Sequence, residues 1–301
     1  MNAIEVTILS IIVMIAVGYI LKRIDFFSSE DTNLLNKIVI NLLLPCMIFN
    51  GLYSADLSAI SKLGILPFVM LATSFVTGLI SFIILKYLNC DDKKLWSVLV
   101  TIMIANTAFM GYPVTLGIFG YDGFIRAIFC DISTSCIFLI LSFILVLKFG
   151  GSVKGAFKKI LTFPPLWAII LALIFNSLSI PIPQVFGQII NYFADATVPL
   201  IMLSLGISIN LEGIYRNKTM VTFTSIMKLV IFPLIAFIIV NILGLAGLQY
   251  TIAVVEAAMP SGMLSLVLAI SYNLDSELTS DCILINTVIS LITLPIIVMI
   301  L

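Results

Sequence analysis

Apolar stretches of about 20 residues follow one another along almost the whole chain, with short polar connections between them. A stretch of that length, coiled as an α-helix, matches the thickness of the hydrocarbon core of a bilayer. The 301 residues are 61% hydrophobic and 10% charged, whereas soluble domains carry roughly 25% charged residues. The sequence therefore predicts an all-α, multi-pass membrane protein.

Ten membrane spans are expected from the positions of these stretches. They lie near residues 3–21, 33–52, 63–86, 95–119, 124–147, 163–180, 184–208, 219–242, 248–271 and 277–300. The first stretch lacks a basic leader and a small-residue cleavage site, so we expect it to be retained as a span.

Basic residues are unevenly distributed over the loops that these spans define. Eleven fall on one side of the membrane, namely Lys22, Arg23, Lys86, Lys93, Lys94, Lys148, Lys154, Lys158, Lys159, Arg216 and Lys218, and two on the other, Lys62 and Arg126. Loops rich in Lys and Arg remain in the cytoplasm. We therefore expect a cytoplasmic membrane protein with both termini extracytoplasmic, whose basic loop from Lys148 to Lys159 meets anionic membrane lipid.

The composition excludes several function classes. The formal net charge is zero, so no basic field favours nucleic acid as a partner. The chain contains no histidine, which removes His-based metal sites and Ser-His or Cys-His catalysis. The five cysteines show no CxxC spacing and are interpreted as small core residues. We expect neither a metal nor a cofactor.

The two halves of the chain share a pattern of prolines. Pro45 in the second span and Pro199 in the seventh lie 154 residues apart, and the same offset carries Asn106 onto Pro260. One offset thus aligns two pairs of spans that proline is expected to interrupt. Five spans per half is an odd number, so the second half enters the membrane from the opposite face. This pattern predicts an inverted-topology repeat.

Spans 4 and 9 contain helix-breaking residues at membrane depth. The sequence "NTAFMGYPV" predicts a break near Gly111–Pro113, and "EAAMPSGM" predicts one at Pro260, Ser261 and Gly262. Interrupted helices in corresponding positions of two halves indicate a transporter site, and their N-termini favour an anion. The alternative is that the prolines are ordinary kinks and that Asn106 bonds a neighbouring span.

Among the charged residues inside the expected spans, we single out Asp131, Lys228 and Glu256. Each costs about 2.5 to 3.5 kcal/mol if it is central and unpaired, so each needs a partner or water. Lys228 is expected to pair with Glu256 or Asp131, as a buried ion pair between spans, or to hold a substrate carboxylate. Burial favours the neutral form of a carboxyl group, which makes Glu256 and Asp131 candidates for proton or ion coupling. Asp281 and Asn286 are weaker candidates.

Several motifs, in this order along the chain, resemble the auxin efflux carrier family. They are "GYILKR", "LNKIVINLLLP", "NTAFMGYP", "ADATVPLIMLSLG", "MKLVIFP" and "VEAAMPSGMLSLVLAISYN". The resemblance covers essentially the whole chain. It implies two inverted five-helix repeats with crossing broken helices 4 and 9, similar to sodium/proton antiporters and bile-acid transporters.

The resemblance also implies two subdomains with different roles. Residues 1–60 and 160–212 would form a scaffold that dimerises, and residues 61–150 and 213–301 a transport subdomain that moves as an elevator. By the family's pattern, Asn106, Pro113 and Pro260 would line an organic-anion site, and Lys228 with Pro233 matches a basic residue and a proline of the family. We expect Lys228 and Ser261 to bind the substrate as well. Phe163-Pro164-Pro165 stands where the plant carriers have Asn-Pro-Asn, which argues against auxin as the substrate. Glu256 stands where they have glutamine, which adds an acid next to the crossing.

The sequence thus predicts a secondary transporter, an exporter, of a small organic anion such as a mono- or dicarboxylate or an auxin-like acid. One alternative is a sodium-coupled importer of the bile-acid type, which would share the fold. Another is an intramembrane enzyme, for which only the isolated aspartates Asp131 and Asp281 are available as catalytic groups.

Overall fold

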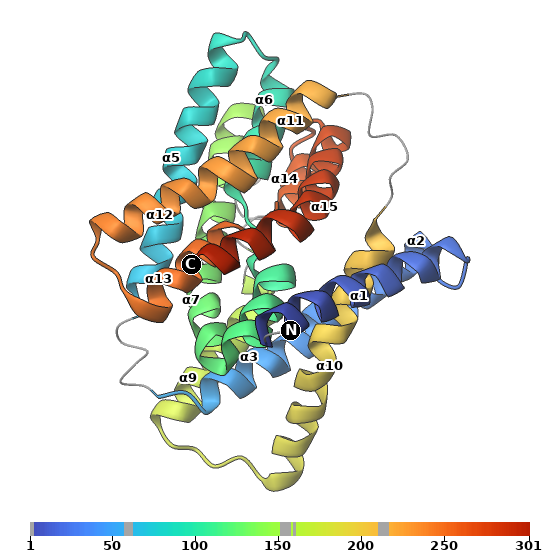
Figure 1. The fold of residues 1–301 in the computed structure, drawn as a ribbon, viewed down its shortest axis with the longest axis vertical. Coiled ribbons are helices and arrows are strands. Elements are labelled where there is room, and N and C mark those ends of the chain that lie inside the picture. The colour runs from blue at the N-terminus through green and yellow to red at the C-terminus, as the bar shows by residue number, and fades with distance from the viewer. Residues whose placement is uncertain (1–2, 57–62, 151–157, 159–160, 210–216) are drawn as a thin grey trace. The chain divides into compact units, whose positions relative to one another are not determined.

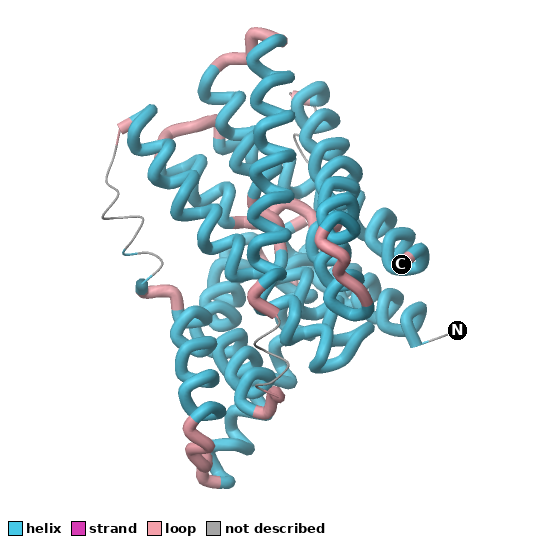
Figure 2. Tube along the Cα trace, turned by 90° about the vertical axis from the view of Figure 1, so that its left-hand side faces the viewer, coloured by secondary structure: helices cyan, strands magenta, loops and turns pink. Residues whose placement is uncertain are grey.

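The computed structural model describes residues 3–56, 63–150, 158, 161–209 and 217–301. Within these ranges the chain is helical throughout, and the segments between helices are short (Figure 2). This confirms the all-α class. Lys62, Lys154, Lys159 and Arg216, which contribute to the charge asymmetry of the loops, lie outside the described residues.

The chain divides into two compact units, each built from separate parts of the sequence. The first comprises Met1–Leu63, Tyr112–Ile128 and Lys158–Ile209, and the second Gly64–Gly111, Phe129–Phe157 and Asn210–Leu301. The first unit therefore includes residues 112–128, which the sequence assigned to the transport subdomain.

The first unit contains α1 (Ala3–Arg23), α2 (Ser29–Ile38), η1 (Val39–Leu43), α3 (Leu44–Tyr53), the beginning of α7 (Tyr112–Phe149), α9 (Pro164–Ser177) and α10 (Gln184–Ser208) (Figure 1). The second contains α5 (Ile65–Tyr87), α6 (Asp92–Met103), η2 (Thr107–Gly111), the remainder of α7, α11 (Lys218–Ile226), η3 (Met227–Ile231), α12 (Phe232–Ile242), α13 (Gly247–Ala257), α14 (Leu264–Ser271) and α15 (Ser276–Ile300).

Seven helical segments of the described chain are long and apolar enough to cross a membrane, and α9 is a shorter apolar helix. One of the seven, Thr107–Phe149, has 43 residues and covers part of the expected span 95–119 and all of the expected span 124–147. It bends at Gly120, whose φ of 65° and ψ of −164° are not helical and favour glycine. The expected spans 95–119 and 248–271 do not form continuous helices, because each is interrupted.

Three prolines each follow a widened, π-helical turn. Pro45, Pro113 and Pro233 lie two residues after the ends of η1, η2 and η3. Proline lacks an N–H and its ring clashes with the carbonyl one turn earlier, and a wider turn relieves that clash. The helix therefore continues past each of them. Pro199 differs again, because α10 runs through it without interruption, so the expected break there is wrong.

The polar loops supply caps for the helices that follow them. The Asp91 carboxylate accepts hydrogen bonds from the backbone N–H groups of Lys93 and Lys94 at the start of α6. Asp275 accepts one from the Leu278 N–H, 2.9 Å away, at the start of α15. These carboxylates satisfy backbone donors that have no partner inside the helix.

Helices α1 and α10 of the first unit approach closely at two glycines. A Cβ atom on Gly206 would fall 2.8 Å from the backbone nitrogen of Tyr19 and 2.9 Å from the Cα of Gly18. Both obstacles belong to the backbone, so no side-chain rotation can relieve the overlap. The packing of α1 against α10 therefore requires glycine at this position.

We expect Gly206→Ala to lower the stability of the protein by roughly 1–3 kcal/mol, because the added methyl group overpacks the helix contact. Gly187→Ala in the same helix is the matched control, since a Cβ there meets nothing within 4 Å. Melting temperatures of the purified variants test this. Equal melting temperatures for Gly206→Ala and the control would contradict the close approach.

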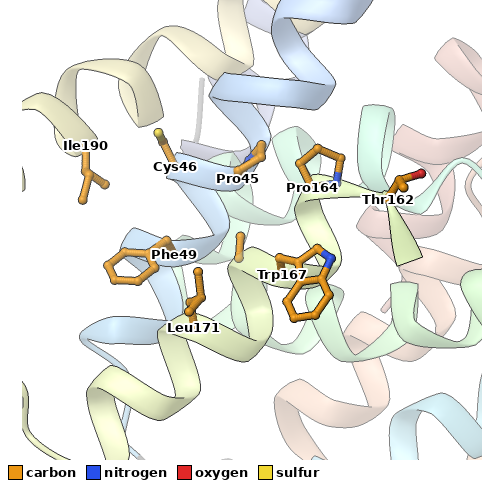
Figure 3. Close-up of a pocket in the computed structure, with 9 residues that line it drawn as sticks. Pro45, Cys46, Phe49, Thr162, Pro164, Trp167, Leu171 and Ile190 are labelled. Atoms are coloured by element: carbon orange, nitrogen blue, oxygen red, sulfur yellow. The ribbon is translucent and has the colours of Figure 1, made fainter. Parts of the chain in front are cut away.

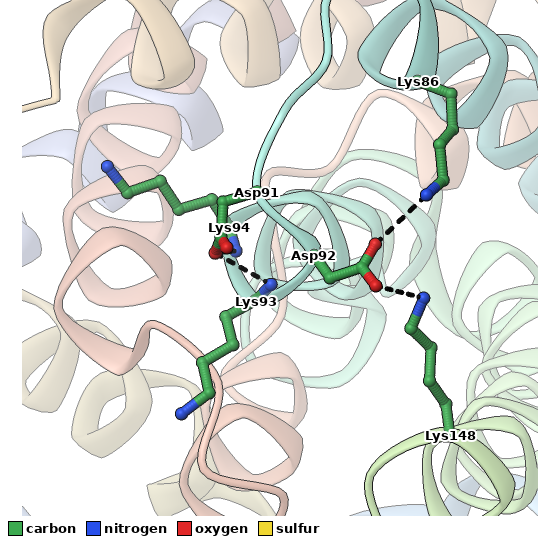
Figure 4. Close-up of polar contacts among 6 residues, drawn as sticks. All are labelled: Lys86, Asp91, Asp92, Lys93, Lys94 and Lys148. Carbon is green, nitrogen blue, oxygen red and sulfur yellow. Dashed lines mark hydrogen bonds and ion pairs between the residues drawn. The ribbon is translucent and has the colours of Figure 1, made fainter.

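Three segments of the second unit are joined by one carboxylate at their ends. Asp92 lies 2.8 Å from Lys148 Nζ and 3.2 Å from Lys86 Nζ, and so links the start of α6 to the ends of α7 and α5 (Figure 4). The Lys148 ammonium also lies 5.7 Å from the centroid of the Trp96 ring. Hydrogen bonds from Lys148 and then Lys86 lower the pKa of Asp92.

This lowered pKa predicts a pH dependence of stability. A carboxyl group whose pKa falls on folding stabilises the protein above its unfolded pKa of about 3.9, and that contribution is lost as the pH falls through the folded value. The difference in melting temperature between wild type and Asp92→Asn should therefore be constant near neutrality and shrink below about pH 4. Asp122→Asn is the control, because Asp122 takes no part in the ion pairs described. Wild type and this variant should not differ in melting temperature in this pH-dependent way. A wild-type advantage that grows on acidification would contradict the assignment.

Candidate functional site

Two interrupted helices of the second unit meet through a short antiparallel backbone pairing. Helix α6 ends at Met103, and α13 ends at Ala257. Beyond these ends, Ala105 and Ser261 form an antiparallel bridge. The Asn106 N–H donates to the Pro260 carbonyl oxygen, 2.8 Å away, and the Gly262 N–H to the Ile104 carbonyl oxygen, 2.9 Å away. We call these paired residues, 104–106 and 260–262, the crossing.

The pairing explains how non-helical backbone is tolerated at this depth. Unpaired N–H and C=O groups are very unfavourable in hydrocarbon, so each interrupted helix must find partners for them. Pro260 has no N–H to offer, and its carbonyl serves as the acceptor instead. Gly262 allows the close approach, because a Cβ there would lie 2.7 Å from the Ala105 carbonyl oxygen.

The break in the fourth predicted span lies earlier than expected. The sequence predicted it near Gly111–Pro113, but Gly111 has helical angles, φ −63° and ψ −48°, and the helix continues into α7. The widened turn η2 accommodates Pro113, which lies at the second position of α7. The break at Ile104–Asn106 contains neither glycine nor proline, so composition alone did not reveal it. The break at Pro260–Gly262 is confirmed.

Ser261 belongs to a buried chain of hydrogen bonds. Its hydroxyl accepts a hydrogen bond from Asn286 Nδ2 at 2.8 Å, and Asn286 Oδ1 accepts one from the Ser225 hydroxyl at 2.6 Å. These side chains come from α15 and α11 and are almost fully buried. Asn286 was only a weaker candidate in the sequence, but the structure brings it directly to the crossing.

Thr107 directly follows residues 104–106 of the crossing, and its hydroxyl is also bound by polar side chains. Its hydroxyl donates to the Asp131 carboxylate on α7, and it lies 3.1 Å from the Thr134 hydroxyl. Asp131 is partly buried, whereas Thr107 is almost fully buried. Thr107 was not predicted as a site residue, because a threonine inside an apolar helix usually bonds its own backbone.

Glu256 lies in the last turn of α13, just before the crossing, and is fully buried. Neither of its carboxylate oxygens has a hydrogen-bond partner among the described residues. The carboxylate lies against Gly111, where a Cβ atom would overlap it. The missing side chain of Gly111 is therefore what leaves room for Glu256.

Lys228 is also fully buried, in the turn η3. Its Nζ lies 3.6 Å from the centroid of the Phe232 ring and has no hydrogen-bond partner in the described part of the chain. A cation over an aromatic face is stabilised by the ring quadrupole. The expected ion pair between Lys228 and Glu256 does not form, since neither side chain has a hydrogen-bond partner.

Asn106 is 5% exposed, and the hydrogen bond that joins it to Pro260 is made by its backbone N–H. This hydrogen bond of the crossing does not use the amide side chain. Within the described ranges, no group of three or more His, Cys, Asp or Glu side chains is placed to hold a metal ion.

The first unit has a hollow of about 500 Å³ with an almost entirely apolar lining (Figure 3). It lies among α3, the start of α9 and α10, and is lined by Pro45, Cys46, Phe49, Thr162, Pro164, Trp167, Ala168, Leu171 and Ile190. None of the predicted site residues contributes to it. The apolar hollow and the polar crossing are thus features of different units.

The crossing can be tested by cross-linking. Residues paired in an antiparallel bridge have Cα atoms about 4.5–5.5 Å apart, within the range of a disulfide. In a background without the five native cysteines, Ala105→Cys with Ser261→Cys should cross-link on mild oxidation. Mass spectrometry of the digested protein would detect the joined peptides.

The matched control pairs Ala105→Cys with Ala246→Cys. Ala246 lies at the start of α13, whereas the crossing lies beyond the end of this helix. A helix of 11 residues is about 16 Å long, so Ala246 is about that far from the crossing. Equal cross-linking of both pairs would contradict the pairing at the crossing.

Comparisons with known proteins agree on one family. The chain matches the family described as membrane transport protein over residues 3–298. It is 41% identical to an uncharacterized transporter of Methanothermobacter thermautotrophicus, over 96% of this chain and 95% of that protein. A second uncharacterized transporter, of Methanocaldococcus jannaschii, is 33% identical over 95% of both chains. Auxin efflux carrier component 1 of Arabidopsis thaliana is 26% identical over 43% of this chain and 21% of its own length.

Proposed function

Because the chain belongs to the membrane transport protein family, with the plant auxin efflux carriers among its relatives, we propose that it is a secondary transporter of a small organic anion. The substrate class is a mono- or dicarboxylate or an auxin-like acid. The observation that carries this proposal is the buried ammonium of Lys228, which has no hydrogen-bond partner in the described chain and lies in the unit that contains the crossing. A carboxylate of the substrate is the counter-charge that such a group lacks.

The crossing supports the same substrate class. Helices begin directly after it on both strands, at Thr107 and at Leu264. The first backbone N–H groups of a helix have no acceptor within the helix, and the helix dipole makes that end favourable for an anion. In this proposal the side-chain amide of Asn106 binds polar groups of the substrate. Pro260 and Ser261 shape the site through the break. The role of Pro113, which belongs to the first unit, stays a prediction from the sequence.

The element bounds support an internal repeat. A shift of 154 residues carries α6 (Asp92–Met103) onto residues 246–257, which nearly coincide with α13, and carries the break at 104–106 onto 258–260. The same shift carries residues 29–53, spanning α2 to α3, onto 183–207, which nearly coincide with α10. We propose that the halves are inverted repeats within a ten-span topology and that both termini are extracytoplasmic.

The two compact units support an elevator mechanism, with the first unit as a dimerising scaffold and the second as the moving part. In a cytoplasmic membrane whose interior is negative, an anion leaves down the electrical gradient, by about 2.3 kcal/mol per charge per 100 mV. Export therefore needs no coupled ion, and we propose an exporter. Coupling to an inward sodium gradient would instead make the protein an importer.

Asn106→Ala tests the proposed site. The substitution removes the amide but keeps the backbone that forms the crossing, so the protein should fold and bind its substrate at least about tenfold more weakly, as expected for one lost hydrogen bond to a charged group. A thermal-shift screen of mono- and dicarboxylates, indole acids and an organic amine would identify the ligand, and calorimetry would give both affinities.

Asn241→Ala is the control, since Asn241 is an exposed amide on α12 that bonds only its own helix. It should bind as well as wild type. A best ligand that is cationic, or an Asn106→Ala variant with wild-type affinity, would contradict the proposed function.

A further inference from the structure

The apolar hollow of the first unit contains none of the residues of the proposed transport site, and its chemistry is different (Figure 3). The Thr162 hydroxyl donates to the Lys158 carbonyl oxygen, 2.9 Å away, and Trp167 Nε1 to the Leu161 carbonyl oxygen, 2.7 Å away. The other side chains that line the hollow are apolar, apart from the Cys46 thiol, which is a weak hydrogen-bonding group. A charged ligand would lose its hydration here without gaining partners from these side chains, so the hollow suits a hydrocarbon chain.

The walls of the hollow are formed by side chains that cannot fill it. The Phe49 ring on α3 is in edge-to-face contact with the Phe175 ring on α9, with a distance of 5.7 Å between the centroids. Cys46 and Ala168, which line the hollow from α3 and α9, are small. Protein interiors leave few voids larger than a water molecule. A hollow of about 500 Å³ in a membrane-spanning protein is therefore a place for a molecule from the bilayer.

The hollow opens at the surface of the unit. Trp167 and Leu171, one turn apart on α9, are 48% and 46% exposed although both line it. Trp167 is the fourth residue of α9, so it lies at one end of this apolar helix. Tryptophan is enriched at the level of the lipid headgroups, where its ring meets hydrocarbon and its N–H meets polar groups. This position indicates that the hollow opens near the membrane surface.

A positive charge lies just beyond this end of α9. Lys158 is exposed, and it precedes Thr162 by one helical turn, since both the N–H and the hydroxyl of Thr162 donate to its carbonyl oxygen. Residues four apart lie on the same helical face. The described residues give Lys158 no ion-pair partner. At the membrane surface, the headgroup of an anionic lipid supplies the missing counter-charge.

We propose that the hollow binds one hydrocarbon chain of an anionic membrane lipid, with Trp167 at the level of the headgroup and Lys158 next to its negative charge. The site goes beyond the proposed function, because it belongs to the first unit and does not depend on what is transported. A second copy of this chain would have to supply both a side chain for the hollow and an acid for Lys158, whereas an anionic lipid carries both groups in one molecule.

The fluorescence of Trp167 tests the lipid site. The chain has two tryptophans, so Trp96→Phe leaves Trp167 as the single reporter. Bromine atoms on a lipid chain quench a tryptophan that they contact. In phosphatidylcholine vesicles with a rising fraction of brominated phosphatidylglycerol, Trp167 should be quenched as if the anionic lipid were enriched about fivefold or more, which is the effect of one lysine at a membrane surface. Brominated phosphatidylcholine should show no such enrichment.

The matched control moves the reporter along the same helix. Ile170→Trp, in a chain with Trp96→Phe and Trp167→Phe, places it three residues further on, at an exposed position that does not line the hollow. This reporter should follow the bulk lipid composition. Lys158→Gln, a change at an exposed position, should lower the enrichment at Trp167 about fivefold. Equal enrichment at both reporters, or an enrichment that survives Lys158→Gln, would overturn the lipid site.

A second copy of the chain in the hollow would give a different result. Trp167 would then be shielded from brominated chains with either headgroup when the vesicles hold the protein as a dimer, and it would become quenched in lipid nanodiscs that hold one copy each. That outcome would also overturn the lipid site. Quenching with the expected enrichment in the one-copy nanodiscs and in the vesicles alike would support it.

Discussion

The structure of the second unit depends on backbone hydrogen bonds made outside any helix. Ile104, Asn106, Pro260 and Gly262 pair through two such bonds, at 2.8 and 2.9 Å. In a bilayer, broken helices are stable only if the exposed backbone finds partners, and here each break supplies partners for the other. Ser261 lies on this pairing, Thr107 directly follows it, and Glu256 lies four residues before Pro260 at the end of α13, so the pairing helps to position all three side chains.

Most of the prolines discussed above do not break the helix in which they lie. Pro45, Pro113 and Pro233 follow π-helical turns, and the helix continues beyond them. Widening one turn satisfies the geometry at little cost, since the lost hydrogen bond is confined to that turn. A true break occurs where a second backbone is close enough to pair, as at Pro260.

The sequence predicted the all-α class and the break at Pro260, because the length of an apolar stretch and the position of a proline are local properties. It also predicted that the segments containing Asn106 and Ser261 would meet at the crossing. It placed the other break at Gly111–Pro113 because composition cannot reveal a widened turn. Of the two roles expected for Lys228, the ion pair with Glu256 does not form, because the direction of a buried side chain depends on how the helices pack. The other role, holding a substrate carboxylate, stays a prediction. Thr107 and Asn286 were missed or given little weight, because their partners lie 24 and 25 residues away on other helices.

Each compact unit is assembled from both halves of the chain, and this affects biosynthesis. Residues 210–301 of the second unit leave the ribosome after the rest of the chain is made. Until they arrive, residues 104–106 lack the antiparallel partner that residues 260–262 supply. The nascent first half must therefore be protected, by water, lipid headgroups or an insertion chaperone, until Pro260 is synthesised and the crossing closes.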